Sequence, residues 1–231
     1  MAIELYDLAG GDEALRFSPY CWRARMALAH KGLDVETIPV RFGEKHKVEF
    51  SGQKLVPVLR DGTNVVCDSW DIALYLDKAY SDRPALMDGP QALALTNFVR
   101  SFVQTRLGPP IMRMVLLDIH DACSKQDQRY FRQSREQRFG MPLEKFVVPE
   151  EEGRVTLKSE LSPLRDMLGL QYYLCGDKPA YADYIVFGHF MWARGVSGKK
   201  MLDGDDPVHA WRERMLDLFD GLARKAPGAG A

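Results

Sequence analysis

Three short segments in the first seventy residues combine side chains and backbone that suit the binding of an anionic thiol. Ser18-Pro19-Tyr20-Cys21 puts a hydroxyl where a helix is expected to begin, since proline suits the first helical position and serine the N-cap. Unpaired N–H groups and the positive end of the helix dipole favour an anion there, such as a thiolate. Val56-Pro57-Val58 is a proline within a strand pattern, which predicts an edge, a bulge or a cis peptide bond. Asp68-Ser69 begins another helix, and the three segments together predict a cradle for a small peptide that carries a thiol.

Length, charge and cysteine usage narrow the setting. The chain has 231 residues, enough for one large domain or two small ones, and its 31 basic and 32 acidic residues give a net charge of -1. This balance gives no electrostatic reason to expect nucleic acid or a membrane surface as a partner. No apolar run approaches a membrane span, and the first residues lack a signal-peptide pattern, so we expect a cytoplasmic protein. The four cysteines show no close pairing, which predicts reduced thiols and no metal site.

The first third of the chain alternates between strand and helix patterns. Strands are expected over residues 3–8, 35–40, 56–60 and 64–67, helices over 19–30 and 69–80, and a short helix and loop over 41–54. The strand–helix–strand order at the start fits a right-handed parallel crossover, and Asp61-Gly62 predicts a hairpin turn. These patterns predict an α/β domain over residues 1–80.

From residue 91 the pattern is helical almost throughout. Residues 93–107 and 111–120 look like one long helix interrupted near Pro109-Pro110, and further helices are expected over 127–139, 156–168, 180–196 and 208–222. A linker is expected between Ser81 and Pro90, and the tail from Ala226 is expected to be disordered. The second domain is therefore predicted to be all-helical, over residues 91–231.

The order of these elements, with these motifs in these places, resembles the cytosolic glutathione transferases. Val56-Pro57 resembles the family's cis-proline, Asp68-Ser69 its acidic-residue–serine pair, and Leu174–Asp183 the segment that opens the core helix of its second domain. The resemblance implies a thioredoxin-like domain followed by a helical domain, glutathione as co-substrate, and a homodimer. It also implies that the Val56 backbone pairs with the cysteine of glutathione, while Asp68 and Ser69 hold its γ-glutamyl group. Ala180 departs from the family's usual serine or threonine, which removes half of a capping box with Asp183.

Four features resemble one branch of that family, which contains the bacterial glutathione-dependent β-aryl etherases and the fungal A class. They are the long loop before Phe17, Asp68-Ser69-Trp70, Ser134–Gln137 and Asp217–Leu222. The chain lacks the longer C-terminal tail of the etherases. The resemblance therefore supports the branch better than it supports the lignin-type substrate.

Two hydroxyls compete for the role of thiol activator. The resemblance and the companion motifs favour Ser18, which would donate a hydrogen bond to the sulfur of glutathione and favour the thiolate without losing its own proton. Tyr6 is the alternative, since some transferase classes use a tyrosine at the end of the first strand, but its ring is expected to pack within the strand. Ser18 also stands where a redox Cys-Pro-Tyr-Cys motif has its first, reactive cysteine. Cys21 is therefore expected to be a buried structural thiol.

The remaining polar residues have alternative interpretations. Gln53 and Lys54 either reach the glycine carboxylate of glutathione or lie in a solvated loop. The second-substrate pocket is predicted from Phe17, Tyr20, Met112, Arg113 and Leu116. Asp118–Asp121 is expected to be an exposed helix end rather than a metal site. A solvated helix face is expected for Arg129, Arg132, Arg135 and Arg138.

The leading functional hypothesis is a glutathione transferase that activates the glutathione thiol for attack on an electrophilic, aromatic substrate. In the etherase version, the thiolate displaces an aryloxide from the carbon next to a ketone. The alternative is a low-turnover, glutathione-dependent binding protein for aromatic ligands, which needs the same glutathione cradle. A thiol–disulfide enzyme is disfavoured, because Ser18 stands where the reactive cysteine would be.

Overall fold

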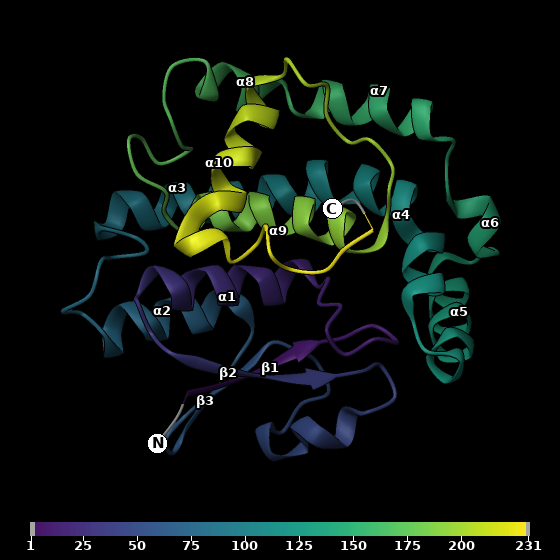
Figure 1. Ribbon diagram of the computed structural model, residues 1–231, viewed down its shortest axis with the longest axis horizontal. Coiled ribbons are helices and arrows are strands. Elements are labelled where there is room, and N and C mark those ends of the chain that lie inside the picture. Colours follow the sequence, from purple (N-terminus) through teal and green to yellow (C-terminus); the bar gives the residue numbers. More distant parts are fainter. Residues whose placement is uncertain (1–2, 230–231) are drawn as a thin grey trace.

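The computed structural model describes residues 3–229, and a four-stranded sheet forms the base of its N-terminal half (Figure 1). The strands lie in the order β2-β1-β3-β4 and are β1 (Ile3–Leu8), β2 (Val35–Val40), β3 (Val58–Asp61) and β4 (Asn64–Cys67). β1 pairs with β2 in parallel, whereas β3 pairs antiparallel with β1 and with β4. Two helices, α1 (Pro19–His30) and α2 (Ser69–Ala79), lie between the sheet and the helical half, and the short helix η1 (Lys45–Ser51) follows β2.

Local sequence signals explain where these elements begin and end. α1 begins at Pro19 with Ser18 as its N-cap, and Gly32 follows the helix with a positive φ of 62° that favours glycine. β3 begins at Val58 rather than at the expected Val56, because Pro57 has no N–H to donate to the sheet. The Val56-Pro57 peptide bond is cis, as the sequence predicts.

Helices follow α2 along the rest of the described chain. They are α3 (Gly89–Phe102), the π-helical turn η2 (Val103–Leu107), α4 (Gly108–Ala122), α5 (Lys125–Phe139), α6 (Leu143–Phe146), α7 (Glu150–Glu160), α8 (Ser162–Leu168), α9 (Tyr181–Val196) and α10 (Pro207–Gly221). α9 runs through the middle of this half and packs against α1, α3, α4 and α10. The predicted fold class, an α/β half followed by an all-helical half, is confirmed. Within residues 3–229, no helix is both long and apolar enough to cross a membrane.

Several boundaries in the helical half differ from those expected. Gly89 and Pro90 lie in the first turn of α3 rather than in a linker, because a helix accommodates proline at its start. The long helix is interrupted at η2, before Pro109-Pro110, and both prolines lie in the first turn of α4. The helix expected over 156–168 is two helices, because Pro163 cannot continue the hydrogen bonding of α7. The short helix α6 was not expected.

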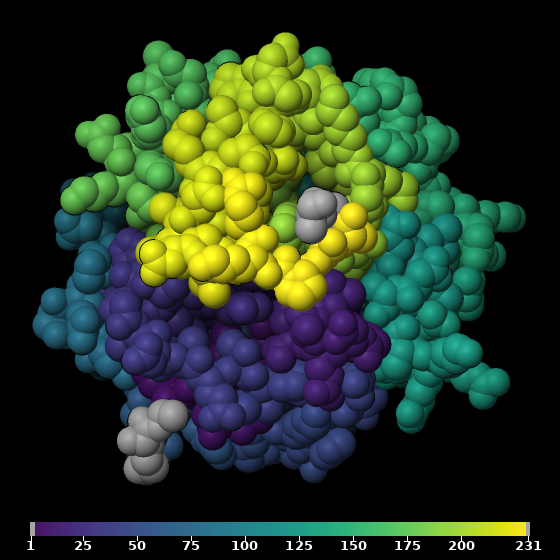
Figure 2. Space-filling view, viewed as in Figure 1, coloured from purple at the N-terminus to yellow at the C-terminus, as the bar shows by residue number. Residues whose placement is uncertain are grey.

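The expectation of a disordered tail is wrong for residues 226–229, while residues 230–231 lie outside the described part. The Arg194 guanidinium donates to the Ala226 carbonyl at 2.9 Å, and the Ala229 N–H donates to the Gly195 carbonyl at 3.2 Å. These backbone partners hold the tail against the end of α9. In Figure 2 the yellow C-terminal residues lie along the boundary between the two halves.

The start of α9 contains the incomplete capping box. The Ala180 side chain has no acceptor, so only the reverse bond is made, from the Ala180 N–H to Asp183 Oδ2 at 3.1 Å. Asp183 is buried, and its Oδ1 also accepts from the Leu174 N–H at 2.8 Å and from Trp211 Nε1 at 2.9 Å. The carboxylate thus joins the preceding loop, α9 and α10, which compensates for the missing half of the box.

Two glycines of α9 allow the first turn of α1 to approach it closely. A Cβ at Gly188 would lie 2.4 Å from the Pro19 carbonyl oxygen, and a Cβ at Gly195 would lie 2.9 Å from the Phe17 Cβ. Real Cβ atoms do not approach backbone this closely, so the positions of Phe17, Ser18 and Pro19 depend on the absence of side chains at these two sites.

We expect Gly188→Ala to lower the free energy of unfolding and to displace the first turn of α1. Overpacking costs about 1–3 kcal/mol or more, which exceeds the roughly 1 kcal/mol gained from the helix propensity of alanine. Urea unfolding measures the loss. Gly204→Ala, in a turn where nothing lies within 4 Å of a Cβ, is the control and should not lower the unfolding midpoint. Equal stability of the two variants would contradict this role of Gly188.

Candidate functional site

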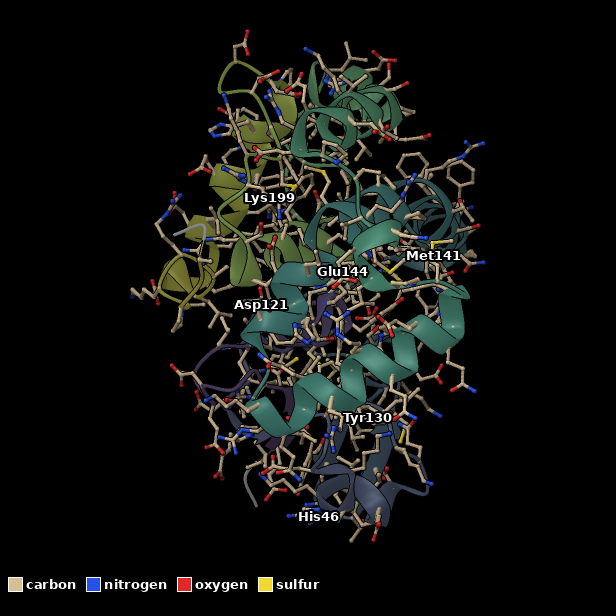
Figure 3. The ribbon with its side chains drawn as sticks, turned by 90° about the vertical axis from the view of Figure 1, so that its right-hand side faces the viewer. His46, Asp121, Tyr130, Met141, Glu144 and Lys199 are labelled. Atoms are coloured by element: carbon tan, nitrogen blue, oxygen red, sulfur yellow. The ribbon has the colours of Figure 1, made fainter. Side chains whose placement is uncertain are left out.

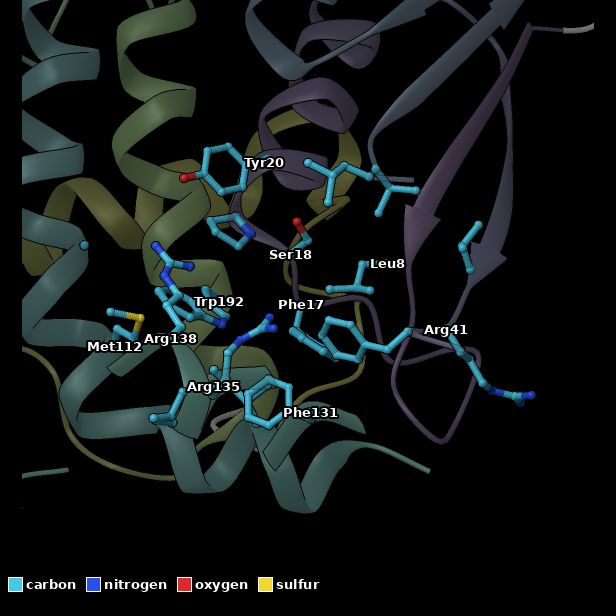
Figure 4. A pocket seen from close by; sticks show the side chains of 18 of the residues that line it. Leu8, Phe17, Ser18, Tyr20, Arg41, Met112, Phe131, Arg135, Arg138 and Trp192 are labelled. Carbon is cyan, nitrogen blue, oxygen red and sulfur yellow. The ribbon is translucent and has the colours of Figure 1, made fainter. Parts of the chain in front are cut away.

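A cavity of about 470 Å³ lies between the first turn of α1 and the helices α4, α5 and α9 (Figure 4). The sequence-predicted residues that line it are Phe17, Ser18, Tyr20, Lys54, Val56, Met112 and Leu116. Much of the remaining lining is aromatic or cationic, from Phe42, Phe131, Trp192, Arg41, Lys45, Arg135 and Arg138. The cavity therefore combines a helix N-terminus, aromatic walls and positive charge.

Ser18 lies at the cavity wall and is 5% exposed. Its Oγ accepts a hydrogen bond from the Cys21 N–H at 3.3 Å, which makes Ser18 the N-cap of α1. That bond uses a lone pair of the hydroxyl and leaves its proton free to be donated. A sulfur placed beside Ser18 would therefore meet both an O–H donor and the positive end of the helix dipole.

Beneath Ser18, the Cys21 thiol is buried, as the sequence predicts. Its Sγ accepts from the Leu8 N–H at 3.5 Å, and burial raises the pKa of the thiol well above its usual value. The nearby Asp7 carboxylate is also buried, with one oxygen 3.6 Å from guanidinium nitrogens of Arg16 and Arg25. Cys21 is thus held protonated below the cavity rather than presented to a ligand.

Tyr6, the alternative activator, has its hydroxyl engaged elsewhere. The hydroxyl donates to Glu4 Oε2 at 3.1 Å, and the ring centroid lies 5.0 Å from that of Phe50. Burial raises the pKa of Tyr6, and the neighbouring Glu4 carboxylate raises it further. Tyr6 is not among the residues that line the cavity. This geometry favours Ser18 over Tyr6.

The β3–β4 hairpin brings two of the predicted segments together. Val58 pairs with Cys67 in antiparallel register, so Pro57 and Asp68 leave the ladder side by side. Asp68 has a φ of 71°, and its Oδ1 caps α2 by accepting from the Trp70 N–H at 2.8 Å. Ser69 is buried, and its carbonyl accepts from the Tyr181 hydroxyl. Gln53, Pro57, Asp68 and Ser69 are outside the cavity lining, although they adjoin its residues Lys54 and Val56 in sequence or across the hairpin.

Two predictions about arginines need correction. Arg113 is exposed, and its Nε donates to the Phe146 carbonyl at 3.3 Å, because position 113 is turned away from Met112 around α4. Arg135 is half-buried in the cavity lining rather than on a solvated face, whereas Arg138 lines the cavity but is exposed, as expected. The available sequence signal was Phe131, the apolar residue that precedes them on the same helix face by four and seven positions.

α5 closes one side of the cavity and reaches the sheet half (Figure 3). Tyr130 projects from α5 toward η1, where Lys45 Nζ donates to the Tyr130 hydroxyl at 2.6 Å. The same ammonium lies 4.5 Å from the centroid of the Tyr130 ring. This contact joins the two halves of the chain across the mouth of the cavity.

His189 is a lining residue that the sequence analysis did not identify. It is 3% exposed, lies beside Tyr20 and Trp192, and its Nδ1 is 3.3 Å from the Ile185 carbonyl. Burial, together with the nearby Arg23 charge, lowers the pKa of His189 to about 3. The imidazole is therefore neutral at physiological pH.

We expect this depressed pKa to make stability depend on pH. The neutral histidine is favoured in the folded chain, so its contribution is present above the unfolded-state pKa of 6.5 and is lost as pH falls toward 3. Below pH 6.5, the free energy of unfolding of the wild type should decline relative to that of His189→Asn, by up to about 1.4 kcal/mol per pH unit. Unfolding titrations across this pH range measure the difference. His46→Asn, at an exposed position, is the control and should reproduce the wild-type profile. Parallel profiles for wild type and His189→Asn would contradict the expectation.

Comparisons with known proteins agree with this architecture. Residues 14–88 match the sequence profile of the glutathione S-transferase N-terminal domain, and residues 94–218 match that of the C-terminal domain. The chain is 39% identical to glutathione S-transferase Z1 of Arabidopsis thaliana over 87 residues, which are 33% of this chain and 39% of that protein. It thus spans about two-fifths of the length of such plant relatives.

Longer matches cover nearly the whole chain. Glutathione S-transferase omega-1 of Mus musculus is 26% identical over 208 residues, 87% of this chain and 74% of that protein. The crystal structure of glutathione transferase GSTFuA2 from Phanerochaete chrysosporium superposes with a TM-score of 0.78 at 27% identity, covering 96% of this chain and 93% of that one. Because the two profiles together cover most of the sequence and the sheet and helical halves fold accordingly, the chain belongs to the glutathione S-transferase family.

Proposed function

We propose that the protein is a glutathione transferase in which Ser18 activates the glutathione thiol for attack on an electrophilic, aromatic substrate. One observation carries the proposal: the Ser18 hydroxyl, at the N-terminus of α1, lies in the wall of a cavity that also has aromatic walls. The thiol and the electrophile would then meet in one cavity.

The chemistry follows from the surroundings of Ser18. The Cys21 N–H uses only a lone pair of the Ser18 hydroxyl, so the hydroxyl proton can still be donated to a sulfur. A hydrogen bond donated to sulfur stabilises the thiolate more than the thiol, so it lowers the pKa of bound glutathione. Each unit of lowering corresponds to about 1.36 kcal/mol in favour of the thiolate. Thiols at helix N-termini reach pKa values of about 3.5–7.5 by this combination of donors and dipole.

Glutathione binding is assigned to groups remote from the sulfur. The Val56 backbone would pair with the cysteine of glutathione, Asp68 and Ser69 would hold the γ-glutamyl group, and Lys54 with Gln53 would meet the glycine carboxylate. The φ of 71° at Asp68 supports the assignment, because such backbone strain costs about 1–3 kcal/mol and is concentrated at functional sites.

In the proposed reaction, the thiolate forms a carbon–sulfur bond and the leaving group departs with the electrons of the bond that breaks. The thiol proton passes to solvent. Halide and aryloxide are both suitable leaving groups, so cleavage of a β-aryl ether is one version of this reaction. The etherase and fungal A class branch remains a prediction from sequence.

The alternative, a glutathione-dependent binding protein for aromatic ligands, would use the same cavity with little turnover. An assay with glutathione across aryl halides and β-aryl ethers separates the two functions. Turnover above the uncatalysed rate supports the transferase, whereas saturable ligand binding without turnover supports the binding protein.

We propose a homodimer in the cytoplasm, as the family resemblance implies. Exposed apolar side chains on α2 and α3 support an interface there: Leu74 on α2, and Leu95 and Phe98 on one face of α3. The Arg100 guanidinium lies 4.5 Å from the centroid of the Trp70 ring, which keeps these two helices in contact. Together they offer an apolar surface to a second copy.

Light scattering at micromolar concentration should therefore give the mass of a dimer. Phe98 is 68% exposed, and Phe98→Glu should shift the population toward monomer because it puts a charge into an apolar contact. Leu170→Glu is the control, since Leu170 is 89% exposed in the loop after α8, outside α2 and α3, and it should leave the mass unchanged. A monomeric wild-type protein would overturn the proposed assembly.

Replacing Ser18 with alanine should lower turnover while leaving glutathione affinity nearly unchanged, because most binding groups lie remote from the sulfur. A lost hydrogen bond to a charged group is worth about 1.5–3 kcal/mol, so the rate at neutral pH should fall by roughly one to two orders of magnitude. The apparent pKa of the bound thiol should rise, which ultraviolet absorbance of the thiolate measures as a function of pH.

Two controls separate chemistry from folding. Ser124 is the N-cap of α5, and its Oγ accepts a hydrogen bond from the Asp127 N–H at 3.2 Å. Ser124→Ala should therefore lower the free energy of unfolding about as much as Ser18→Ala does, with turnover intact. Tyr6→Phe should have little effect on the thiol pKa. If Tyr6→Phe abolishes the thiolate signal while Ser18→Ala keeps full activity, Ser18 is not the activator.

A further inference from the structure

We propose that the electrophile carries an anionic group, in the simplest case a carboxylate on its aromatic ring, and that Arg135 and Arg138 of α5 bind it. This inference rests on the proposed function, because it concerns the substrate of the same cavity. It adds that the electrophile is negatively charged, and it names the two residues that bind this charge.

The charged side chains that line the cavity are positive. Arg41, Lys45, Lys54, Arg135 and Arg138 line it, whereas no Asp or Glu among the described residues does so. A cavity built only for neutral aromatic molecules has no need of this excess, since unpaired charge next to apolar walls is unfavourable. The excess therefore indicates a ligand with negative charge.

Three of the five cations have another partner or another proposed role. Arg41 forms an ion pair with Glu13 at 3.2 Å, and in Figure 4 its side chain points away from Ser18. Lys45 donates to the Tyr130 hydroxyl at the mouth of the cavity. Lys54 precedes Val56 and is already assigned to the glycine carboxylate of glutathione. Arg135 and Arg138 lie on the opposite wall, and their charges are left over.

The surroundings of Arg135 are aromatic. Its guanidinium lies 4.7 Å from the ring centroid of Phe131 and 5.6 Å from that of Phe42, and Nη1 donates to the neutral hydroxyl of Ser134 at 3.0 Å. Within residues 3–229, neither Arg135 nor Arg138 forms an ion pair. Arg132 on the same helix is paired, with Glu136 at 2.9 Å and Glu144 at 2.8 Å.

The two free guanidinium groups also act on each other. Burial lowers the pKa of Arg135, and the charge of Arg138 lowers it further. Both extend from α5 toward the part of the cavity that contains Ser18 and Tyr20 (Figure 4). An anion bound by the pair would relieve their repulsion and accept charge-assisted hydrogen bonds, while its ring packs on Phe131 and Trp192.

Calorimetry with three glutathione conjugates tests this inference without depending on turnover. S-(p-carboxybenzyl)glutathione and S-(p-carbamoylbenzyl)glutathione differ only in the charge of the ring substituent, and S-benzylglutathione has no substituent. In the wild-type protein the carboxylate conjugate should bind about tenfold more tightly than the carboxamide, as expected for hydrogen bonds to a charged group. Arg135→Gln and Arg138→Gln should each reduce that preference, and together they should abolish it.

Arg129→Gln is the matched control, because Arg129 is an exposed arginine of α5 that does not line the cavity, and it should keep the full preference. Arg138 is itself exposed, so its variant tests the charge even if Arg135→Gln weakens the packing of Phe42 and Phe131. Arg138→Gln should lower the preference for the carboxylate conjugate without the general loss of affinity that a disturbed aromatic wall would cause.

Every other outcome overturns part of the argument. If S-benzylglutathione fails to bind at all, the proposed function fails and takes the inference with it. If it binds but the carboxylate and carboxamide conjugates bind equally, only the inference fails. A preference that survives in the double variant would show that the two arginines are not its source. If the arginine variants also bind unmodified glutathione more weakly, and by the same factor, then Arg135 and Arg138 hold the carboxylates of glutathione itself. This result would also overturn the inference.

Discussion

The close packing of the first turn of α1 on the glycine face of α9 is the constraint on which the candidate site depends. Gly188 and Gly195 are two helical turns apart, so they lie on one face and receive Pro19 and Phe17 respectively. This contact sets the position of Ser18, which lies between Phe17 and Pro19 in the sequence. It also joins the sheet half to the helical half where the cavity forms, so the packing of the two halves and the position of Ser18 depend on the same contact. Backbone in such contact cannot adapt as a flexible side chain can.

Most of the sheet half was predictable because its signals are local. Alternating strands, a serine before a proline and an Asp-Gly turn each act within a few residues, and the β3–β4 register then places Pro57 beside Asp68. The boundaries that were wrong depend on proline. Pro90 and Pro163 occur in first turns of helices, where they begin an element, whereas the sequence pattern predicts a linker at Pro90 and helix interior at Pro163.

The cationic wall was not predictable in the same way. Phe131 marks the helix face that Arg135 and Arg138 share, but this spacing does not reveal what that face meets, and the roles of the arginines are set by their tertiary partners. Arg132 meets Glu136 and Glu144, whereas Arg135 meets the Phe42 and Phe131 rings. The rotation of α5 about its axis decides which arginine forms ion pairs and which one lines the cavity. That rotation is fixed by Phe131, which is buried next to Phe42 from the other half of the chain.

The electrostatics of the protein distinguish its own thiols from a thiol brought in by a ligand. Burial raises the pKa of Cys21 well above its usual value and that of Cys123 to about 12, so both stay protonated and unreactive. A ligand thiol beside Ser18 would instead meet a hydroxyl donor and the helix N-terminus. Cys21 and Ser18 are one helical turn apart, yet one faces the core and the other the cavity. Burial therefore keeps the Cys21 thiol protonated, while in the proposed function the start of the same helix would stabilise the thiolate of a bound ligand, so that Cys21 would not compete with the co-substrate.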